Sequence, residues 1–418
     1  WCANGNNDAT NANSNIGSRL AKIRRTEAEV PRGFGQIQNI RGLRPGRKAK
    51  HQNGAAVSRD RKWPHLILRN KMSRTYNYLF DQIADFDNLW MAYLSARKGK
   101  RFRHEVAVFS AQLEENLINI HNHLLWGTWQ PGKARNFVSM EPKRREITAP
   151  PFADRVVHHA IYRVVRPLFD KKFIHHSYAC RNGKGAQAAV KALQGMLRRA
   201  QAKRDKPYIM QADIKSYFAS IRHDDLTVAI RKTIRCEKTL DLWRSVMSGY
   251  GFNGVGRPVG ALTSQLEANI MLDQLDHHMA DDCGYKYLRY MDDFIVVAKD
   301  KKEAQQALQE ARVFVEGIGL RLNPKTAVFP VSAGVDWCGY RTWATHILPR
   351  KRNVKRAKAR LRKAGRDFAF GKISRKEVAQ KTASLRAYMK HCNGKRTTEE
   401  IIKNSIPKGA SCGLKTTF

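Results

Sequence analysis

The segment Tyr290-Met291-Asp292-Asp293 lies between two short stretches that are rich in β-branched and aromatic residues. These stretches, 285–289 and 294–298, have the composition and length of β-strands. Together they predict an antiparallel hairpin whose turn carries two adjacent aspartates. Asp favours turns for local reasons, so the pair alone is compatible with an ordinary turn. Other parts of the chain favour a turn that holds a divalent metal ion.

The overall charge of the chain restricts its partners. The 418 residues suffice for two or three domains with a sizeable core. Lys and Arg number 77 against 36 Asp and Glu, a net charge of +41, which predicts a polyanionic partner. The sequence has no apolar run long enough to span a bilayer and no signal peptide, so no membrane partner is expected. The seven cysteines are scattered without metal-ligand spacing, which predicts free thiols in a reducing cytoplasm.

Composition also divides the chain. Residues 1–20 form an Asn-rich polar tail, and residues 21–72 form a basic arm that we expect to order on nucleic acid. A globular composition begins at about residue 73. Apolar residues from 109 to 124 recur at three- and four-residue spacing, which predicts one helix that stops near Gly127.

A third acidic group follows another predicted strand. Residues 208–218 are predicted to form a strand with Asp213 near its end, and Asp224 is a candidate N-cap of the next helix. We expect Asp213 to meet Asp292 and Asp293 across a sheet.

Cations and glycines stand where phosphates could be bound. Lys143 and Arg145 lie on a predicted strand and would present their charges to one side, although a solvated face explains them equally well. Gly183 and Gly185 at a helix start could admit a phosphate to backbone amides. Gly260, in a loop that enters a long helix, permits close backbone approach.

The chain is most basic near its end. Between Arg350 and Arg366 there are ten Lys or Arg in 17 residues, and the next acid is Asp367. A solvated helix would mix its charges, so this stretch predicts a surface that lies along phosphates. The candidate nucleic-acid-binding residues are Lys351, Arg352, Lys355, Arg356 and Arg360.

These parts fit the joining of a nucleotide to a 3′-hydroxyl group. Two metal ions about 3.5–4 Å apart can activate the attacking oxygen and stabilise the leaving pyrophosphate. Mg²⁺ prefers oxygen ligands and retains water, so two or three aspartates and substrate phosphates suffice. Asp213, Asp292 and Asp293 would supply this set. Lys143 and Arg145 would neutralise a triphosphate, and the basic helices would hold a duplex by its backbone.

The order of these motifs resembles that of reverse transcriptases over roughly residues 100 to 395. The resemblance implies that Asp213 is the catalytic aspartate of motif A, with Ile214 beside it in the metal site. It also implies that 290–293 is motif C. Phe218 matches the aromatic gate that excludes a ribonucleotide 2′-hydroxyl, which argues against an RNA-templated RNA polymerase.

Further matches concern the nucleotide and the primer. The resemblance implies that Arg145 contacts the incoming triphosphate, that Lys325 protonates pyrophosphate, and that 334–340 forms the primer-grip hairpin. It implies an α+β right-hand polymerase with a basic N-terminal arm and a helical thumb. The expected boundaries are fingers 73–205, palm 206–340, thumb 341–405 and a tail at 406–418.

Motif B points to a subfamily. Most reverse transcriptases have Gln-Gly, three residues, then Ser-Pro, whereas residues 259–265 carry Val259 in place of the Gln and Gln265 in place of the Pro. Gly260 is retained. This pattern, and the segment 177–185, resemble diversity-generating retroelement reverse transcriptases. An apolar Val259 would remove a hydrogen-bonding restraint near the nascent pair, a hypothesis for misincorporation opposite template adenines.

The subfamily resemblance implies a biological role and partners. The enzyme would copy a structured template-repeat RNA into adenine-mutagenised cDNA that diversifies a target gene, known as mutagenic retrohoming. It would use two Mg²⁺ ions, dNTPs and a small basic oligomeric accessory protein in the cytoplasm of a bacterial or phage-infected cell. Residues 1–20 resemble a translated template repeat, and an ordinary low-complexity tail is the alternative.

Two other functions are alternatives. A retron- or group II intron-like reverse transcriptase is the nearest alternative, but we find no Val-Thr-Gly in the thumb, which retrons usually carry, and expect no room for an intron nuclease after it. A non-catalytic RNA-binding scaffold on the same fold is the second alternative. The intact Asp213, Asp292 and Asp293 argue against the scaffold, and a primer-extension assay with an Asp292→Ala control discriminates.

Overall fold

A computed structural model describes residues 75–140, 144–202, 206–250 and 253–406 of the chain. The predictions for the tail 1–20, the arm 21–72 and Lys143, and for the end of the chain beyond residue 406, lie outside the described residues. The described part belongs to one compact unit, residues 67–418.

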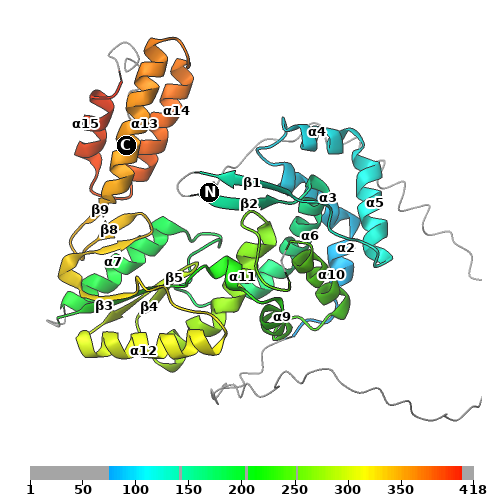
Figure 1. Ribbon diagram of the computed structural model, residues 1–418, viewed down its shortest axis with the longest axis horizontal. Coiled ribbons are helices and arrows are strands. Elements are labelled where there is room, and N and C mark those ends of the chain that lie inside the picture. The colour runs from blue at the N-terminus through cyan, green and yellow to red at the C-terminus, as the bar shows by residue number, and fades with distance from the viewer. Residues whose placement is uncertain (1–74, 141–143, 203–205, 251–252, 407–418) are drawn as a thin grey trace, which may run out of the picture. The chain divides into compact units, whose positions relative to one another are not determined.

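The first described part is a layer of helices with a two-stranded ribbon (Figure 1). The predicted helix over 109–124 is two helices, because Gln112 leaves the helical conformation between them. Gly127 follows the second helix in a left-handed conformation, as the sequence predicts. The elements are α2 Phe80–Ala84, α3 Phe86–Arg97, α4 His104–Ala111, α5 Leu113–Leu125, β1 Arg135–Ser139, β2 Arg145–Ala149 and α6 Phe152–Asp170.

The centre of the fold is a four-stranded antiparallel sheet in the order β4-β5-β3-β6. Alternate residues of its strands point to opposite faces. One face, which includes Met210 and Val296, shares a core with α12, and the other, which includes Ile209 and Val297, shares a core with α7 (Figure 1). The elements are α7 Ala186–Ala202, β3 Tyr208–Asp213, β4 Tyr287–Tyr290, β5 Asp293–Ala298, α12 Lys301–Gly317 and β6 Ala327–Pro330.

The strand predicted over 208–218 is correct only as far as Asp213. Ser216 takes a left-handed φ of 50°, which turns the chain into the short helix α8, Tyr217–Ser220. The next helix has Arg222 rather than Asp224 as its N-cap, so that prediction was wrong, and Asp224 lies in the first turn. The elements that follow are α9 His223–Arg231, α10 Glu237–Ser248, α11 Leu262–His277 and the π-helical turn η1 His278–Asp282.

A second, three-stranded sheet leads into a helical bundle. The 3-10 turn η2 Val331–Ala333 precedes β7 Val335–Trp337, β8 Tyr340–Thr342 and β9 Ile347–Pro349. The bundle of α13 Lys351–Ala369, α14 Arg375–Met389 and α15 Lys395–Lys403 has its own apolar core, which includes Leu361 and Val378. The mixed helix-and-sheet architecture confirms the predicted α+β class. Within the described ranges, no helix combines the length and the apolar content that crossing a membrane requires.

Candidate active site

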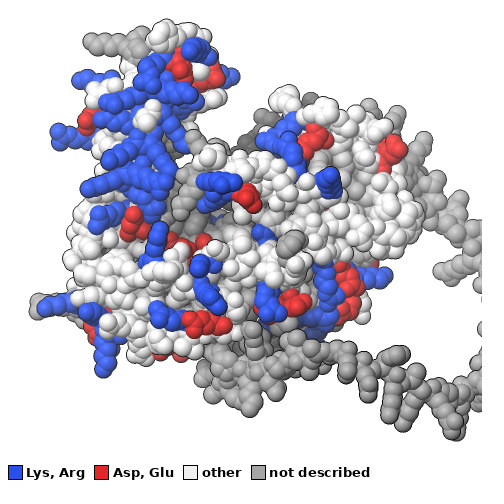
Figure 2. All heavy atoms as spheres, in the orientation of Figure 1, with Lys and Arg blue, Asp and Glu red and all other residues white. Residues whose placement is uncertain are grey.

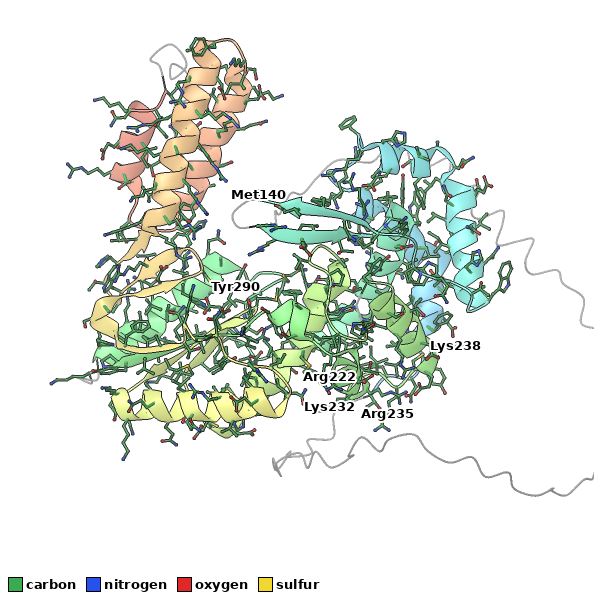
Figure 3. The ribbon with its side chains drawn as sticks, in the orientation of Figure 1. Met140, Arg222, Lys232, Arg235, Lys238 and Tyr290 are labelled. Atoms are coloured by element: carbon green, nitrogen blue, oxygen red, sulfur yellow. The ribbon has the colours of Figure 1, made fainter. Side chains whose placement is uncertain are left out.

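The three aspartates converge at one end of the central sheet. Asp213, the last residue of β3, is the direct cross-strand partner of Asp293, the first residue of β5. Asp292 lies in the turn before it, and its carbonyl accepts a hydrogen bond from the Ile214 amide at 3.2 Å. The carboxyl groups of Asp213 and Asp292 lie within hydrogen-bond reach of each other. Figure 3 labels Tyr290 at this end of β4 and Met140 just beyond β1.

A buried arginine side chain stabilises the backbone of this turn. Met291 has a φ of 60°, a left-handed conformation that is costly for a residue other than glycine. The guanidinium group of Arg289, which is fully buried on β4, donates a hydrogen bond of 2.8 Å to the Met291 carbonyl. Arg289 therefore holds the backbone of the aspartate turn in place.

Arg289 belongs to a buried polar network that our reading of the sequence missed. Its guanidinium donates two hydrogen bonds of 2.6 Å to the buried carboxylate of Asp276 on α11, and a third of 3.0 Å to Asn269. The Tyr287 hydroxyl donates to the same carboxylate at 2.9 Å. The sequence does carry a signal for this network, which is an arginine inside an otherwise apolar strand. A buried charge requires a partner, so such an arginine indicates a buried acidic side chain nearby.

The electrostatics of the cluster suit a cation. Burial, followed by the charge of Asp213, raises the pKa of Asp292 to about 6, and the charge of Arg145 offsets part of this shift. Burial also raises the pKa of Asp293 to about 7, with the charges of Asp213 and Asp292 acting in the same direction. The carboxylates repel one another when they are ionised, and a bound divalent cation would neutralise this repulsion.

The oxygen donors fit Mg²⁺, provided that a substrate completes the coordination. Asn323 donates a hydrogen bond of 3.1 Å to Asp213, and Gln211 donates one of 3.3 Å to Asp293, which orient these two carboxylates. In the part of the chain described here, three His, Cys, Asp or Glu side chains are nowhere arranged as a ready-made metal site. Mg²⁺ commonly uses one or two carboxylates with phosphates and water, which matches this arrangement.

The loop of motif B approaches the ribbon. Gly260 has a φ of 129°, and a Cβ atom there would lie 3.2 Å from Ile147 Cγ2 and 3.3 Å from the Thr148 carbonyl. Only glycine fits both the conformation and the space. Val259 beside it is half-buried, and Gln265 is exposed in the first turn of α11.

Three other predicted nucleotide-binding residues lie on separate elements. Arg145 is the first residue of β2, and its positive charge acts to lower the pKa of Asp292. Phe218 is half-buried on α8 and makes an edge contact with Tyr217, with ring centroids 5.8 Å apart. Lys325 is exposed in the turn before β6.

One of the two glycines before α7 is used differently from the prediction. The Gly185 amide donates a hydrogen bond of 3.0 Å to the Tyr178 carbonyl, so this amide is not available to a phosphate.

Helix α13 presents a basic surface. Leu361, Ala364 and Gly365 are buried against the bundle. Figure 2 shows Lys and Arg side chains gathered over this helix. Of the predicted nucleic-acid-binding residues, Arg356 is half-buried, and the exposed ones are Lys351, Arg352, Lys355 and Arg360.

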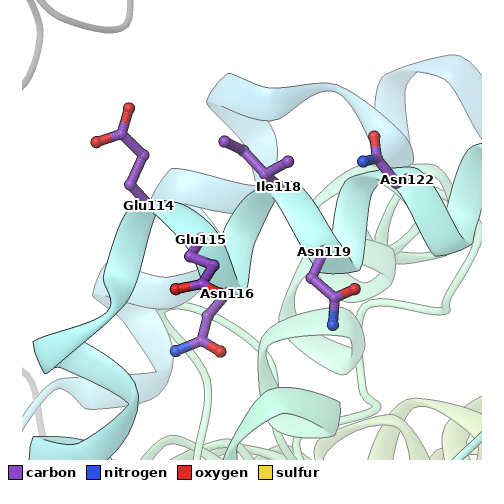
Figure 4. Close-up of a pocket in the computed structure, with 6 residues that line it drawn as sticks. All are labelled: Glu114, Glu115, Asn116, Ile118, Asn119 and Asn122. Carbon is purple, nitrogen blue, oxygen red and sulfur yellow. The ribbon is translucent and has the colours of Figure 1, made fainter.

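A surface depression elsewhere is separate from this site. It lies over α5 and contains none of the predicted site residues (Figure 4). Its lining consists of Glu114, Glu115, Asn116, Ile118, Asn119 and Asn122.

Comparison with known proteins identifies the family. Residues 133–342, half of the chain, match the family described as reverse transcriptase (RNA-dependent DNA polymerase). The chain belongs to the reverse transcriptase family. It is an RNA-directed DNA polymerase with the right-hand fold, and the match spans all three aspartates and the motif B loop.

Individual relatives differ in how much they share. Protein YkfC of Escherichia coli is 26% identical over 56% of this chain and 73% of its own length. The group II intron-encoded protein LtrA of Lactococcus lactis is 26% identical over 39% of this chain, which spans only 28% of LtrA. A solved structure of apo telomerase from Candida tropicalis, truncated from its C-terminal domain, aligns with a TM-score of 0.39 and 15% identity, over 52% of this chain and 55% of that chain.

Proposed function

We propose that this reverse transcriptase copies a template-repeat RNA into adenine-mutagenised cDNA, with nucleotidyl transfer at Asp213, Asp292 and Asp293. The observation that carries the catalytic part is the direct pairing of Asp213 with Asp293, with Asp292 in the adjoining turn. The proposal places the enzyme in the cytoplasm of a bacterial or phage-infected cell.

The proposed metal ligands are the carboxylates of Asp213, Asp292 and Asp293 and the backbone carbonyl of Ile214, the only oxygen that Ile214 offers. Bound Mg²⁺ ions would activate the primer hydroxyl and neutralise charge on the leaving pyrophosphate. Asn323 and Gln211 hold two of these carboxylates in orientation through their amides.

The surrounding residues are assigned to the nucleotide. Arg145 neutralises the triphosphate, and its charge already reaches Asp292. Phe218 closes the site to a 2′-hydroxyl group, and the exposed ammonium group of Lys325 donates a proton to pyrophosphate. Gly260 lets the motif B loop approach β2. Val259, Gly260 and Gln265 are assigned to the nascent base pair.

The basic surface of α13 is assigned to the backbone of the template–primer duplex. We expect the triple variant Lys351→Gln/Arg352→Gln/Lys355→Gln to bind an RNA–DNA duplex more weakly at every sequence, because phosphate contacts carry no sequence information. The plot of log affinity against log salt concentration should become less steep, by about one unit of slope for each lost contact. Fluorescence anisotropy over a salt series measures both quantities.

A matched control removes three charges elsewhere. Lys299, Lys301 and Lys302 are exposed at the start of α12, on the opposite side of the central sheet from α7. Their replacement by Gln should leave the salt slope unchanged. Equal weakening in both triple variants would assign the binding to net charge rather than to α13.

The mutagenic role rests on motif B. Val259 cannot donate or accept a side-chain hydrogen bond, so it leaves a nascent pair less restrained than a glutamine would. We expect Val259→Gln to lower misincorporation opposite template adenines severalfold and to leave errors at other bases nearly unchanged. Sequencing of cDNA made on a defined RNA measures this. An unchanged error spectrum would reject the role of Val259.

The accessory protein and the structured RNA belong to the same proposal. A group II intron-like function is the second candidate, favoured by the similarity to LtrA. Purification of the chain with its own flanking RNA and the neighbouring small basic protein, followed by cDNA sequencing, separates the two. Adenine-directed errors in a repeat support the retroelement, and faithful copying of an intron RNA supports the alternative.

A further inference from the structure

We infer that Gln211 is a positioning residue that couples the catalytic carboxylate of Asp293 to the start of the thumb helix α13. The inference rests on the proposed role of Asp293 in nucleotidyl transfer. Gln211 lies on β3 two residues before Asp213, so both side chains point to the same face of the sheet. Asp293 pairs with Asp213 and therefore shares this face.

The Gln211 amide bridges two sheets. Its Nε2 atom donates a hydrogen bond of 3.3 Å to Asp293 Oδ1 and another of 3.3 Å to the backbone carbonyl of Asp336. Asp336 is the middle residue of β7, in the sheet that leads to the thumb. A primary amide has two N–H groups on one nitrogen, so a single side chain can serve both acceptors.

The chain of contacts continues into the thumb. The carboxylate of Asp336 forms an ion pair with Arg350, which also donates a hydrogen bond of 3.4 Å to the Asp336 carbonyl. Arg350 is the N-cap residue of α13, and its own amide donates to the Gly339 carbonyl at 3.1 Å. Asp293, Gln211, Asp336 and Arg350 therefore form one continuous path from the aspartate cluster to the basic helix.

This arrangement has a functional consequence. When α13 engages a duplex, a displacement of its first turn acts on Asp336 through Arg350, and Gln211 transmits it to Asp293. The thumb thereby biases the orientation of one carboxylate according to whether a duplex is held. Loss of the bridge should reduce the rate of the chemical step more than the affinity for nucleotide, because small misplacements at a reacting centre are costly.

The test is Gln211→Leu, which keeps the side-chain size and removes the amide. In single-turnover primer extension on preformed complexes, we expect the maximal rate to fall between about tenfold and a hundredfold. The dissociation constants of dNTP and duplex should stay within about twofold of wild type. The matched control is Gln274→Leu, which removes a half-buried glutamine of α11 that accepts a hydrogen bond from Lys232.

Arg350→Met alone keeps the inference testable should Gln211→Leu fold poorly, because it too should lower the maximal rate of primer extension while dNTP binding stays within about twofold of wild type. Arg350→Met breaks the same path at its exposed end, and the double variant should be no slower than the slower single variant, because members of one path are not additive. Without nucleotide, hydrogen–deuterium exchange at residues 335–337 should be faster in Gln211→Leu than in wild type.

The outcomes are distinct. A wild-type rate in Gln211→Leu, or multiplicative losses in the double variant, overturns the coupling. If Asp292→Asn is inactive while Gln211→Leu is normal, only this inference fails and the proposed catalytic site stands. If Asp292→Asn is active, the proposed site itself fails.

Discussion

Asp292→Asn should abolish primer extension, with a rate at least about a thousandfold below wild type, a loss of the size that follows removal of a key charged group at a reacting centre. Asn keeps the size of the side chain but loses the charge that a divalent ion requires. The folded protein should be no less stable, because burial and the charge of Asp213 both disfavour the ionised form of Asp292 and raise its pKa. Primer extension with Mg²⁺ and urea unfolding in metal-free buffer measure the two effects.

The matched control for this variant is Asp224→Asn. Asp224 is exposed in the first turn of α9, and the same chemical change there should leave extension at the wild-type rate. If Asp292→Asn keeps more than a tenth of the wild-type rate, Asp292 is not a catalytic ligand.

Arg289→Met should cause the largest loss of stability, about 3–5 kcal/mol in the free energy of unfolding. The substitution leaves the buried Asp276 carboxylate without its cation and the Met291 carbonyl without its donor. Denaturant unfolding followed by circular dichroism measures the loss. Arg289→Lys should also be destabilising, because an ammonium cannot reproduce the two-pronged contact with Asp276.

Two other variants serve as controls for the stability loss expected in Arg289→Met. The double variant Arg289→Met/Asp276→Leu should recover part of the lost stability, because it removes the uncompensated buried charge. Arg244→Met breaks an exposed pair with Asp241 and should cost less than about 1 kcal/mol. A loss below 1 kcal/mol for Arg289→Met would show that the network contributes little to the fold.

The aspartate turn was predictable because its signals are local. Two short β-rich stretches around a polar pair specify a hairpin, and the alternation of a strand fixes which residues share a face. The strand that ends at Asp213 carried the same signal, and the structure pairs that residue with Asp293 itself. The strand prediction failed just beyond Asp213, where the left-handed Ser216 redirects the chain into α8.

The supports of the site were not predictable. The position of Arg289 in an apolar strand indicates a buried charge. Its partners Asp276 and Asn269 lie on α11, and no sequence periodicity relates that helix to the strand. Gln211 is an unremarkable residue until β7 is placed beside β3. Such contacts depend on tertiary packing, which local patterns do not encode.

The basic helix lies between these two cases. Its charge excess is visible in the sequence, but the face that remains exposed depends on how α13 packs in its bundle. Burial of Leu361 and Ala364 directs one side inward and leaves most of the cations outward.

The most direct test of the central claim is anomalous diffraction from crystals of the enzyme with a primer–template, a non-hydrolysable dNTP and Mn²⁺. The account predicts two anomalous peaks about 3.5–4 Å apart, both within coordination distance of carboxylate oxygens of Asp213 and Asp292. A well-ordered nucleotide beside the primer end, with no anomalous peak between those two carboxylates, would contradict it.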